Sequence, residues 1–222
     1  MRDNMCAQKA SSSTETDDGS DTRQRVVEAA ISCILERGFY RASSNAIAEQ
    51  AGLTWGVIQY YFGTREALML AVLEEASRRL SRTLGEAEIT GETLTERVEQ
   101  FFDVLADYYG SPDYLAFIQV QLNLGHDPRT SERSRENLAE LNERANPQLK
   151  SLMAKVVAGK GSGKRRQNLT NLLFHALRGV SMSHVMLGTV PIYEHNLPGD
   201  FLAERRLLAR AMSLLIEQEL GG

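Results

Sequence analysis

Histidine and cysteine supply many metal sites and nucleophilic centres, so the search for chemistry begins with them. The chain has four histidines: His126, His175, His184 and His195. No pair has the HExxH spacing of a zinc enzyme, and the nine residues from His175 to His184 do not put them one turn apart on a single helical face. No Gly-rich phosphate loop or nucleophile motif is present either. We therefore expect no catalytic residue, no metal ion and no cofactor.

The two cysteines, Cys6 and Cys33, suggest neither a disulfide framework nor a zinc site by number or spacing. That usage is typical of a reducing cytoplasm. The sequence has no apolar run of membrane-spanning length, and its N-terminus lacks the apolar segment of a signal peptide. We expect a cytoplasmic protein without a membrane partner.

A different chemistry is indicated by the stretch LTWGVIQYYFGTREAL, which concentrates aromatic rings directly after a glycine. On a helical wheel, one side of this stretch carries Trp55, Gln59 and Tyr60. The other side carries Ile58 and the Tyr-Phe pair at 61–62. One side of so short a helix cannot be core, so it is available for binding.

Helical periodicity predicts the elements that must position these rings. Residues 1–20 are small, polar and acidic and are predicted to be a disordered tail. Caps and glycine stops then predict helices over about 21–37, 44–51, 54–62 and 64–84, with Ser43 or Ser44 as one N-cap and Thr54 and Thr64 as others.

The second half is also helical by pattern. Apolar stripes predict helices near 94–108, 112–125, 138–156, 165–188 and 200–219, with Pro147 splitting the third of these and 159–164 as a turn or loop. The expected fold is all-α: a DNA-binding domain at 21–66 and a ligand-binding and dimerisation domain at 67–222.

The two short helices around AGLT have the pattern of a helix-turn-helix. Gly52 permits the tight turn, and the buried contacts that fix the angle are predicted for Ile47, Ala48, Leu53 and Ile58. Such a motif leaves one face of its second helix free, and that helix fits the major groove of DNA.

The segment TRQRVVEAAISCILERGFYRASSNAIAEQAGLTWGVIQYYFGTREALMLAVL resembles the N-terminal domain of the TetR family of transcriptional regulators. The features that match are Arg-Gly-Phe at 37–39, the IAEQAGLT turn, the Tyr-Phe pair and the TREAL that follows. The resemblance covers about residues 22–75. It implies a homodimer that binds a palindromic double-stranded DNA operator, most often a repressor released by a small-molecule effector.

The resemblance also implies roles for individual residues. Contacts with the DNA backbone are expected from Ser43, Ser44 and Asn45 at the start of the first motif helix. Thr54, among the expected DNA-binding residues, caps the second helix, whose base-facing positions are Trp55, Gly56, Val57 and Gln59. Phosphate contacts are expected from Tyr60, Tyr61 and Arg65. Trp55 and Gln59 depart from the residues commonest in the family, so the operator sequence cannot be taken from relatives.

Three of these positions also have a simpler interpretation. Trp55 could cover the surface of its own domain, or it could contact thymine methyl groups. Gln59 could be solvated, or it could pair with adenine. Tyr61 could join Phe62 in the core, which would leave Tyr60 alone at the phosphate.

Charge gives weak support to this assignment. The net charge is −4 over 222 residues, which excludes a uniformly basic nucleic-acid binder. Residues 22–85, however, hold eight arginines against six glutamates and are the net-positive section. Within it, Arg78, Arg79 and Arg82 fit a solvated helix end better than a basic patch.

The second domain is predicted to hold the effector site. Its apolar wall is assigned to aromatic and aliphatic residues, namely Phe101, Leu105, Tyr108, Phe117 and Phe174. Its polar groups are assigned to Gln121, His175 and Arg178, which lie on otherwise apolar helices. The aromatic residues are equally suited to a core. His175, Arg178 and His184 could instead pair across a dimer interface, since 165–188 and 200–219 are predicted to form a four-helix bundle with their symmetry mates.

Two other functions remain open at this point: an all-helical enzyme, and a helical adaptor that does not bind DNA. The missing catalytic motifs count against the first, and the helix-turn-helix pattern counts against the second.

Overall fold

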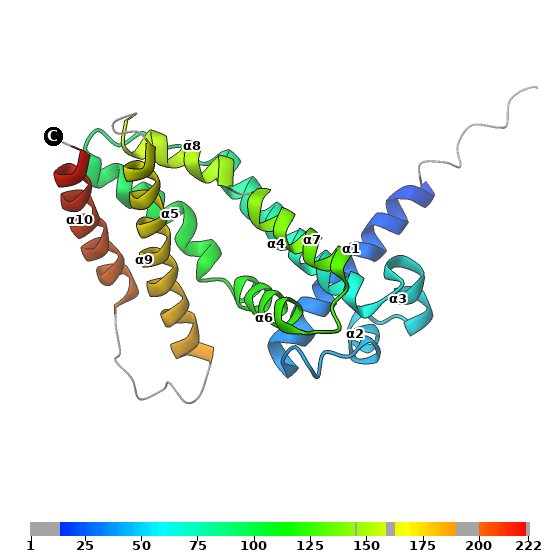
Figure 1. Ribbon diagram of the computed structural model, residues 1–222. Coiled ribbons are helices and arrows are strands. Elements are labelled where there is room, and N and C mark those ends of the chain that lie inside the picture. The colour runs from blue at the N-terminus through cyan, green and yellow to red at the C-terminus, as the bar shows by residue number, and fades with distance from the viewer. Residues whose placement is uncertain (1–13, 145, 159–162, 190–199, 221–222) are drawn as a thin grey trace, which may run out of the picture. The chain divides into compact units, whose positions relative to one another are not determined.

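The computed structural model describes residues 14–144, 146–158, 163–189 and 200–220. Within these ranges every regular element is an α-helix, which confirms the predicted all-α class (Figure 1). The helices are α1 Thr14–Arg37, α2 Ser44–Ala51, α3 Trp55–Phe62, α4 Arg65–Glu86, α5 Leu94–Tyr109, α6 Pro112–His126, α7 Glu132–Arg144, α8 Asn146–Val156, α9 Gly163–Thr189 and α10 Phe201–Leu220.

The chain divides into two compact units, one ending at Val72 and one beginning at Leu73. The division falls inside α4, as does the predicted boundary between residues 66 and 67. Helix α4 therefore contributes its first turns to one unit and its remainder to the other.

The first unit is built on the apolar face of α1. Val26, Ala30 and Ile34 recur every four residues, and all three are fully buried. Helix α1 packs against α2, and α2 packs against α3. Ile47 of α2 and Ile58 of α3 are also fully buried, so both motif helices have anchor residues in one small core.

Helix α1 begins at Thr14, earlier than the predicted start at Asp21. The prediction of disorder over 1–20 is therefore not met from Thr14 onward, and residues 1–13 lie outside the described residues. The acidic residues Glu15, Asp17 and Asp18 occupy the first turns of the helix.

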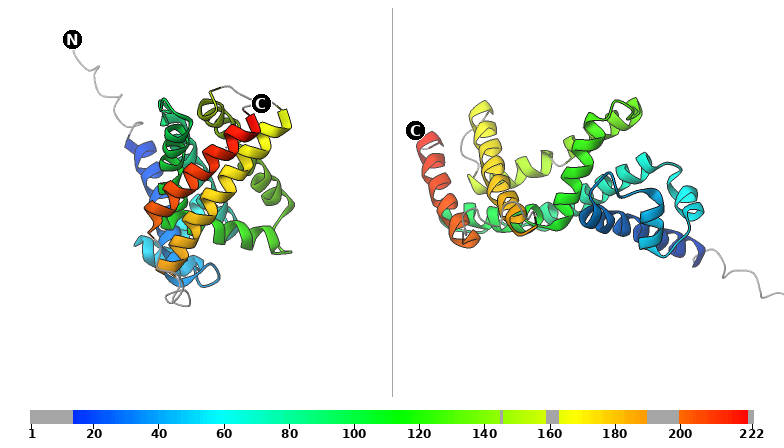
Figure 2. Two further views of the ribbon diagram at one scale, coloured as in Figure 1. Left: turned by 90° about the vertical axis from the view of Figure 1, so that its left-hand side faces the viewer. Right: turned by 90° about the horizontal axis from the view of Figure 1, so that it is seen from below.

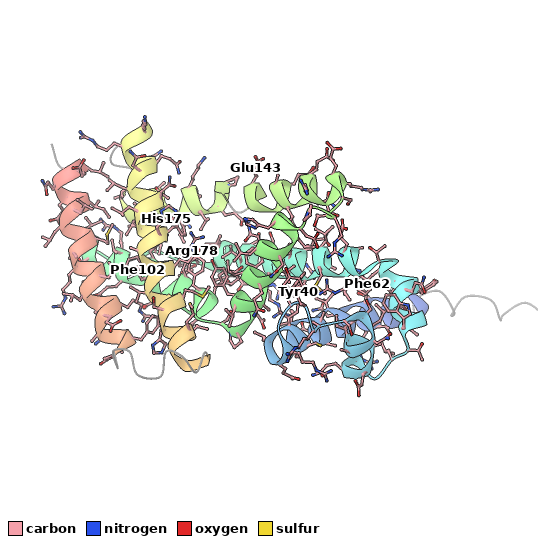
Figure 3. All side chains as sticks on the ribbon, turned by 60° about the horizontal axis from the view of Figure 1, so that its bottom comes forward. Tyr40, Phe62, Phe102, Glu143, His175 and Arg178 are labelled. Carbon is pink, nitrogen blue, oxygen red and sulfur yellow. The ribbon has the colours of Figure 1, made fainter. Side chains whose placement is uncertain are left out.

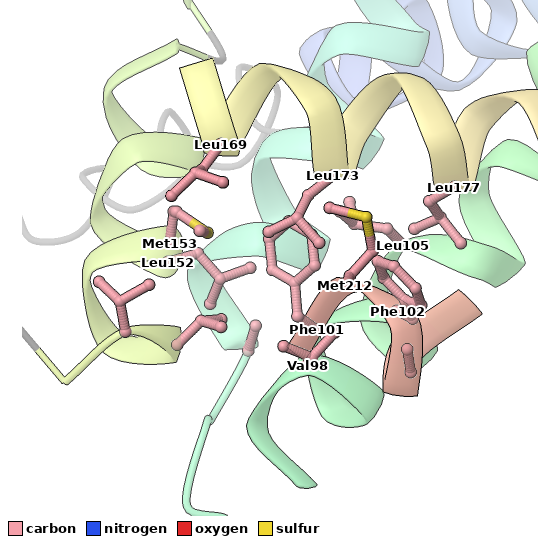
Figure 4. Close-up of a cluster of buried hydrophobic side chains, with 14 of the residues drawn as sticks. Val98, Phe101, Phe102, Leu105, Leu152, Met153, Leu169, Leu173, Leu177 and Met212 are labelled. Atoms are coloured by element: carbon pink, nitrogen blue, oxygen red, sulfur yellow. The ribbon is translucent and has the colours of Figure 1, made fainter. Parts of the chain in front are cut away.

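The second unit is organised around α5, which packs against α6, α8, α9 and α10. Its N-terminus has a capping box: Thr93 Oγ1 accepts a hydrogen bond from Glu96 N at 3.2 Å, and the Glu96 carboxylate accepts one from Thr93 N at 3.0 Å. Figure 4 shows the core that results, with Phe101 and Leu105 of α5 enclosed by side chains such as Met153, Leu173 and Met212.

The predicted break at Pro147 is present. Helix α7 ends at Arg144 and α8 begins at Asn146, which places Pro147 in the first turn of α8, where its missing N–H costs nothing. Helix α9 begins at Gly163, two residues before its predicted start, and residues 159–162 of the predicted loop lie outside the described residues.

Helices α9 and α10 pack side by side at one end of the second unit (Figure 2). The leucines of these two helices divide between the core and the surface. Leu169 and Leu173 belong to the core of this unit, whereas the residues left exposed are Leu172, Leu207 and Leu214, with 44%, 68% and 68% of their surfaces accessible. Helix α9 is apolar on more than one face, so the sequence pattern did not show which face points inward.

Candidate functional site

The turn between α2 and α3 has the predicted geometry. Gly52 has φ 66° and ψ 33°, in the left-handed region that glycine adopts without steric cost. Its N–H donates to Glu49 O at 3.1 Å, and the N–H of Leu53 donates to Ala48 O at 2.9 Å. These bonds close the C-terminus of α2 and fix the angle at which α3 leaves it.

The N-terminus of α2 is capped by Ser43, one of the two predicted caps. Ser43 Oγ accepts a hydrogen bond from Ala46 N at 3.2 Å. Ser43 and Asn45 are exposed and Ser44 is half-buried. The uncompensated N–H groups of this first turn can face an anion such as a phosphate.

Helix α3 presents one polar and aromatic face to solvent. Ile58 is fully buried, whereas Gln59 is exposed and Tyr60 has 83% of its surface accessible. Trp55 and Val57 are half-buried and Gly56 is exposed.

Thr54 occupies the N-cap position of α3, as predicted, but its side chain makes no capping hydrogen bond. The hydroxyl of this exposed residue is therefore not used to close the helix.

The two tyrosines of the motif differ in their surroundings. Their rings meet edge to face with centroids 5.1 Å apart. Tyr61 is half-buried, and its hydroxyl lies 3.6 Å from the position that a Cβ would take at Gly19 of α1. Phe62 is half-buried beneath the Arg23 guanidinium, which lies 5.2 Å from its ring centroid (Figure 3). The geometry therefore leaves Tyr60 as the more accessible of the two hydroxyls.

Arg65 has a structural role that the sequence did not suggest. Its Nε donates to Ala42 O at 3.2 Å and its Nη2 donates to Phe39 O at 2.6 Å. The guanidinium also lies 4.4 Å from the centroid of the Phe39 ring. Burial lowers the pKa of Arg65 from its ordinary value. The side chain thus ties the first turn of α4 to the loop that carries the cap of α2.

Comparison with known proteins identifies this motif. The sequence profile described as "Bacterial regulatory proteins, tetR family" matches residues 26–72, a span that begins inside α1 and ends inside α4. Residues 26–72 are therefore similar to the N-terminal domain of TetR-family regulators.

Two curated relatives have similar sequences. HTH-type transcriptional regulator BetI of Vibrio campbellii is 26% identical over 138 residues, which cover 59% of this chain and 68% of that protein. HTH-type transcriptional repressor AcnR of Corynebacterium glutamicum is 31% identical over 114 residues, 51% of this chain and 54% of the relative. The second match therefore spans about half the length of the relative.

Among solved structures, a transcriptional regulator from Rhodococcus sp. Rha1 superposes with a TM-score of 0.64 at 18% identity, covering 88% of this chain and 96% of that one. At this identity the likeness shows the fold. The relatives that match this chain are themselves named as helix-turn-helix transcription regulators. None of the described helices is long and apolar enough to cross a membrane.

The second unit contains a cavity of about 160 Å³. Its walls come from helices α4, α5, α6, α7 and α9, and it is lined by Ser77, Leu80, Tyr108, Tyr109, Tyr114, Phe117, Gln121, Leu141 and Arg178. Four residues of the predicted effector site are thus brought together: Tyr108, Phe117, Gln121 and Arg178.

The other four predicted effector residues are placed elsewhere. Phe101 and Leu105 are fully buried in the core and do not line the cavity. Phe174 packs its ring against Phe101 with centroids 5.3 Å apart. His175 is exposed on α9, one turn before Arg178, and lines a separate depression with His184 and Glu204 (Figure 3). These contacts favour core and surface roles for the four.

Sequence reasoning missed five cavity residues, three of which are Ser77, Leu80 and Leu141. The other two are Tyr109 and Tyr114. They are brought together by a tight turn at Gly110–Ser111, where Ser111 Oγ accepts from Tyr114 N at 3.2 Å and caps α6. The rings of Tyr109 and Tyr114 lie 4.9 Å apart by centroid. A Tyr-Tyr-Gly-Ser-Pro run is the signal that could have indicated them, because the turn folds both rings onto one side.

Burial raises the pKa of the Tyr108, Tyr109 and Tyr114 hydroxyls. At Tyr109 and Tyr114 the nearby Arg178 guanidinium opposes this rise in pKa. All three phenols are consequently neutral at physiological pH.

Proposed function

We propose that this regulator is a ligand-responsive repressor that binds a palindromic operator as a homodimer and releases it when a small molecule enters the cavity of the second unit. The observation that carries the proposal is the exposed face of α3. Gln59 and Tyr60 project from a helix that Ile58 and the Gly52 turn hold rigidly.

In the proposed complex, α3 enters the major groove and the start of α2 contacts the backbone. Trp55, Gly56, Val57 and Gln59 are the base-facing group, Gln59 having the amide that pairs with adenine. Thr54 and Tyr60 flank this group and contact phosphate; the Thr54 hydroxyl is available because it makes no capping hydrogen bond. Ser43, Ser44 and Asn45 also contact phosphate. Tyr61 contributes less, since it is half-buried against α1.

The proposed dimer interface is the outer face of α9 and α10. Leu207 and Leu214 lie two turns apart on α10, and both are largely exposed. Leu172 and the small residues Ala176 and Gly179 lie on the neighbouring face of α9. Pairing these faces in two protomers would form a four-helix bundle and cover a patch that soluble monomers rarely expose.

The experiment that tests the proposal is selection of bound fragments from genomic DNA by the full-length protein. We expect one or a few sites, each an inverted repeat with half-site centres about one helical turn apart. A control protein with Gln59→Ala should lose preference at the adenine position while retaining non-specific binding. Fragments recovered without a common palindrome would contradict the proposal.

Release is tested with the cavity variant Phe117→Ala and the matched surface variant Leu122→Ala on the same helix. Operator affinity should remain within several-fold of the parent for both, because neither residue is in the first unit. Only Phe117→Ala should impair release by the effector. If it lost DNA binding while folded and dimeric, the assignment of reading and sensing to different units would be wrong.

A further inference from the structure

The cavity in the second unit has an unusual balance of charge. Among its lining residues, Arg178 is the one with a formal charge, and no carboxylate lines the space. Two acids close in sequence to lining residues, Glu75 and Asp113, are paired with arginines outside the cavity. Glu75 accepts from Arg79 Nε at 2.8 Å and bonds Arg78 at 2.5 Å, and Asp113 is bonded to Arg79. The lining itself therefore offers a ligand one formal charge, the Arg178 guanidinium.

The rest of the lining is aromatic and flat. Tyr114 stacks on Phe117 with centroids 5.8 Å apart and planes inclined by 19°. The ring of Tyr108 approaches Tyr114 with centroids 5.3 Å apart. Aromatic faces can hold either a second aromatic ring or a cation. The guanidinium of Arg178, which hydrogen-bonds to the Tyr114 hydroxyl, opposes a second positive charge at the same place.

The volume limits the ligand to about one ring. The cavity measures about 160 Å³. A protein cavity of about 150 Å³ lined by apolar residues accommodates benzene. Arg178 is exposed at the side of α9, so a ring seated against the tyrosines can direct a substituent toward a guanidinium that is open to solvent.

We propose that the cavity binds a single-ring aromatic carboxylate, with the ring between the Tyr114–Phe117 stack and Tyr108 and the carboxylate paired with Arg178. A planar guanidinium matches a carboxylate in a bidentate pair, and one guanidinium balances one negative charge. Gln121 and the hydroxyl of Tyr109 can donate to the remaining carboxylate lone pairs. The inference rests on the proposed function, since it names the effector class of the same site.

The test is titration calorimetry of the full-length protein with three planar probes of one shape: benzoate, its neutral isostere benzamide, and the cation benzamidinium. We expect benzoate to bind about tenfold more tightly than benzamide, the value of one charge-assisted hydrogen-bonded pair at a partly exposed site. The cation should not bind detectably.

The variant Arg178→Gln should lower benzoate affinity by about tenfold and leave benzamide affinity unchanged, so that the two probes become equivalent. The matched control is Arg133→Gln on α7, where the exposed Arg133 does not line the cavity. A thermal melt of each variant checks that it is folded. The proposal is overturned if benzoate does not bind, if either other probe binds as tightly, or if Arg178→Gln binds benzoate like the parent.

A gel shift with the operator separates this inference from the proposed function. If benzoate binds through Arg178 but does not release DNA, the ligand class stands and ligand-induced release fails. If another compound releases DNA while benzoate fails to bind, release stands and the aromatic carboxylate is excluded.

Discussion

Replacing Arg65 with alanine is expected to destabilise the first unit, although the residue is expected from the family resemblance to contact a phosphate. The guanidinium holds the carbonyls of Phe39 and Ala42 and covers the Phe39 ring. Both carbonyls belong to the chain between α1 and α2, directly before the Ser43 cap. Loss of Arg65 therefore releases the loop that fixes where α2 begins.

The size of the effect follows from these contacts. A hydrogen bond from a charged donor contributes about 1.5–3 kcal/mol, and a cation–π contact at an exposed site about 0.5–1 kcal/mol. Arg65 is only half-buried, so water can replace part of what is lost. We expect the free energy of unfolding of the first unit to fall by about 2–4 kcal/mol.

Urea unfolding followed by tryptophan fluorescence measures this change in one unit alone. Trp55 is the single tryptophan of the chain and belongs to α3. For a unit of this size, a loss of about 2–4 kcal/mol lowers the urea midpoint by roughly 2 M. The matched control is Arg41→Ala, in the same loop, where the side chain is exposed. A midpoint for Arg65→Ala equal to that of the control would refute the anchoring role.

DNA binding separates the anchoring role from the phosphate contact. If Arg65 also contacts a phosphate, its loss weakens binding to all sequences and flattens the dependence of log K on log salt by about 0.9 per subunit. If it acts only as an anchor, affinity falls equally at every salt concentration. We expect the dependence of log K on log salt to become flatter in Arg65→Ala. An unchanged dependence would mean that Arg65 does not contact DNA. A loss of affinity confined to one base pair would mean that Arg65 contacts a base.

Three further outcomes are expected. Gly52→Ala places a Cβ in open space but at φ 66°, so the same urea assay should show a loss of about 1–2 kcal/mol together with weaker operator binding. Leu214→Glu should raise the dimer dissociation constant at least about 100-fold in sedimentation experiments, because an unpaired carboxylate would be buried, whereas Leu122→Glu on α6 should not. Cys33 is fully buried, and this burial raises the pKa of its thiol. In a Cys6→Ser variant, iodoacetamide should therefore modify Cys33 only as the first unit unfolds, which mass spectrometry can follow.

The helix-turn-helix could be predicted from the sequence because its determinants are local. Ser43 caps the helix that begins at the next residue, and Gly52 ends the same helix. Ile47 and Ile58 are buried as their helical spacing indicates. The role of Arg65 could not be predicted, since Phe39 lies 26 positions away in the chain and no periodicity links the two.

The second unit was predicted less completely because its helices are apolar on more than one face. Leu169, Leu172 and Leu173 look equivalent in the sequence, yet Leu172 is exposed and the other two are buried. Phe101 and Phe117 are likewise both aromatic residues on apolar helices, but Phe101 is core and Phe117 lines the cavity. Long-range packing decides such cases, and a single sequence does not record it.

Helix α4 offers a physical route between sensing and reading. It carries Arg65 in its first turn and contributes Ser77 and Leu80 to the cavity wall. Twelve residues of helix separate Arg65 from Ser77, about 18 Å at the rise of an α-helix, with no glycine or proline between them to absorb a bend. Under the proposed function, we expect a ligand that favours one position of Ser77 and Leu80 to act on the first unit through this helix. If the proposed release takes place, the ligand shifts the operator-bound state only by its difference in affinity for the two arrangements, and we predict that operator and effector weaken each other by the same factor.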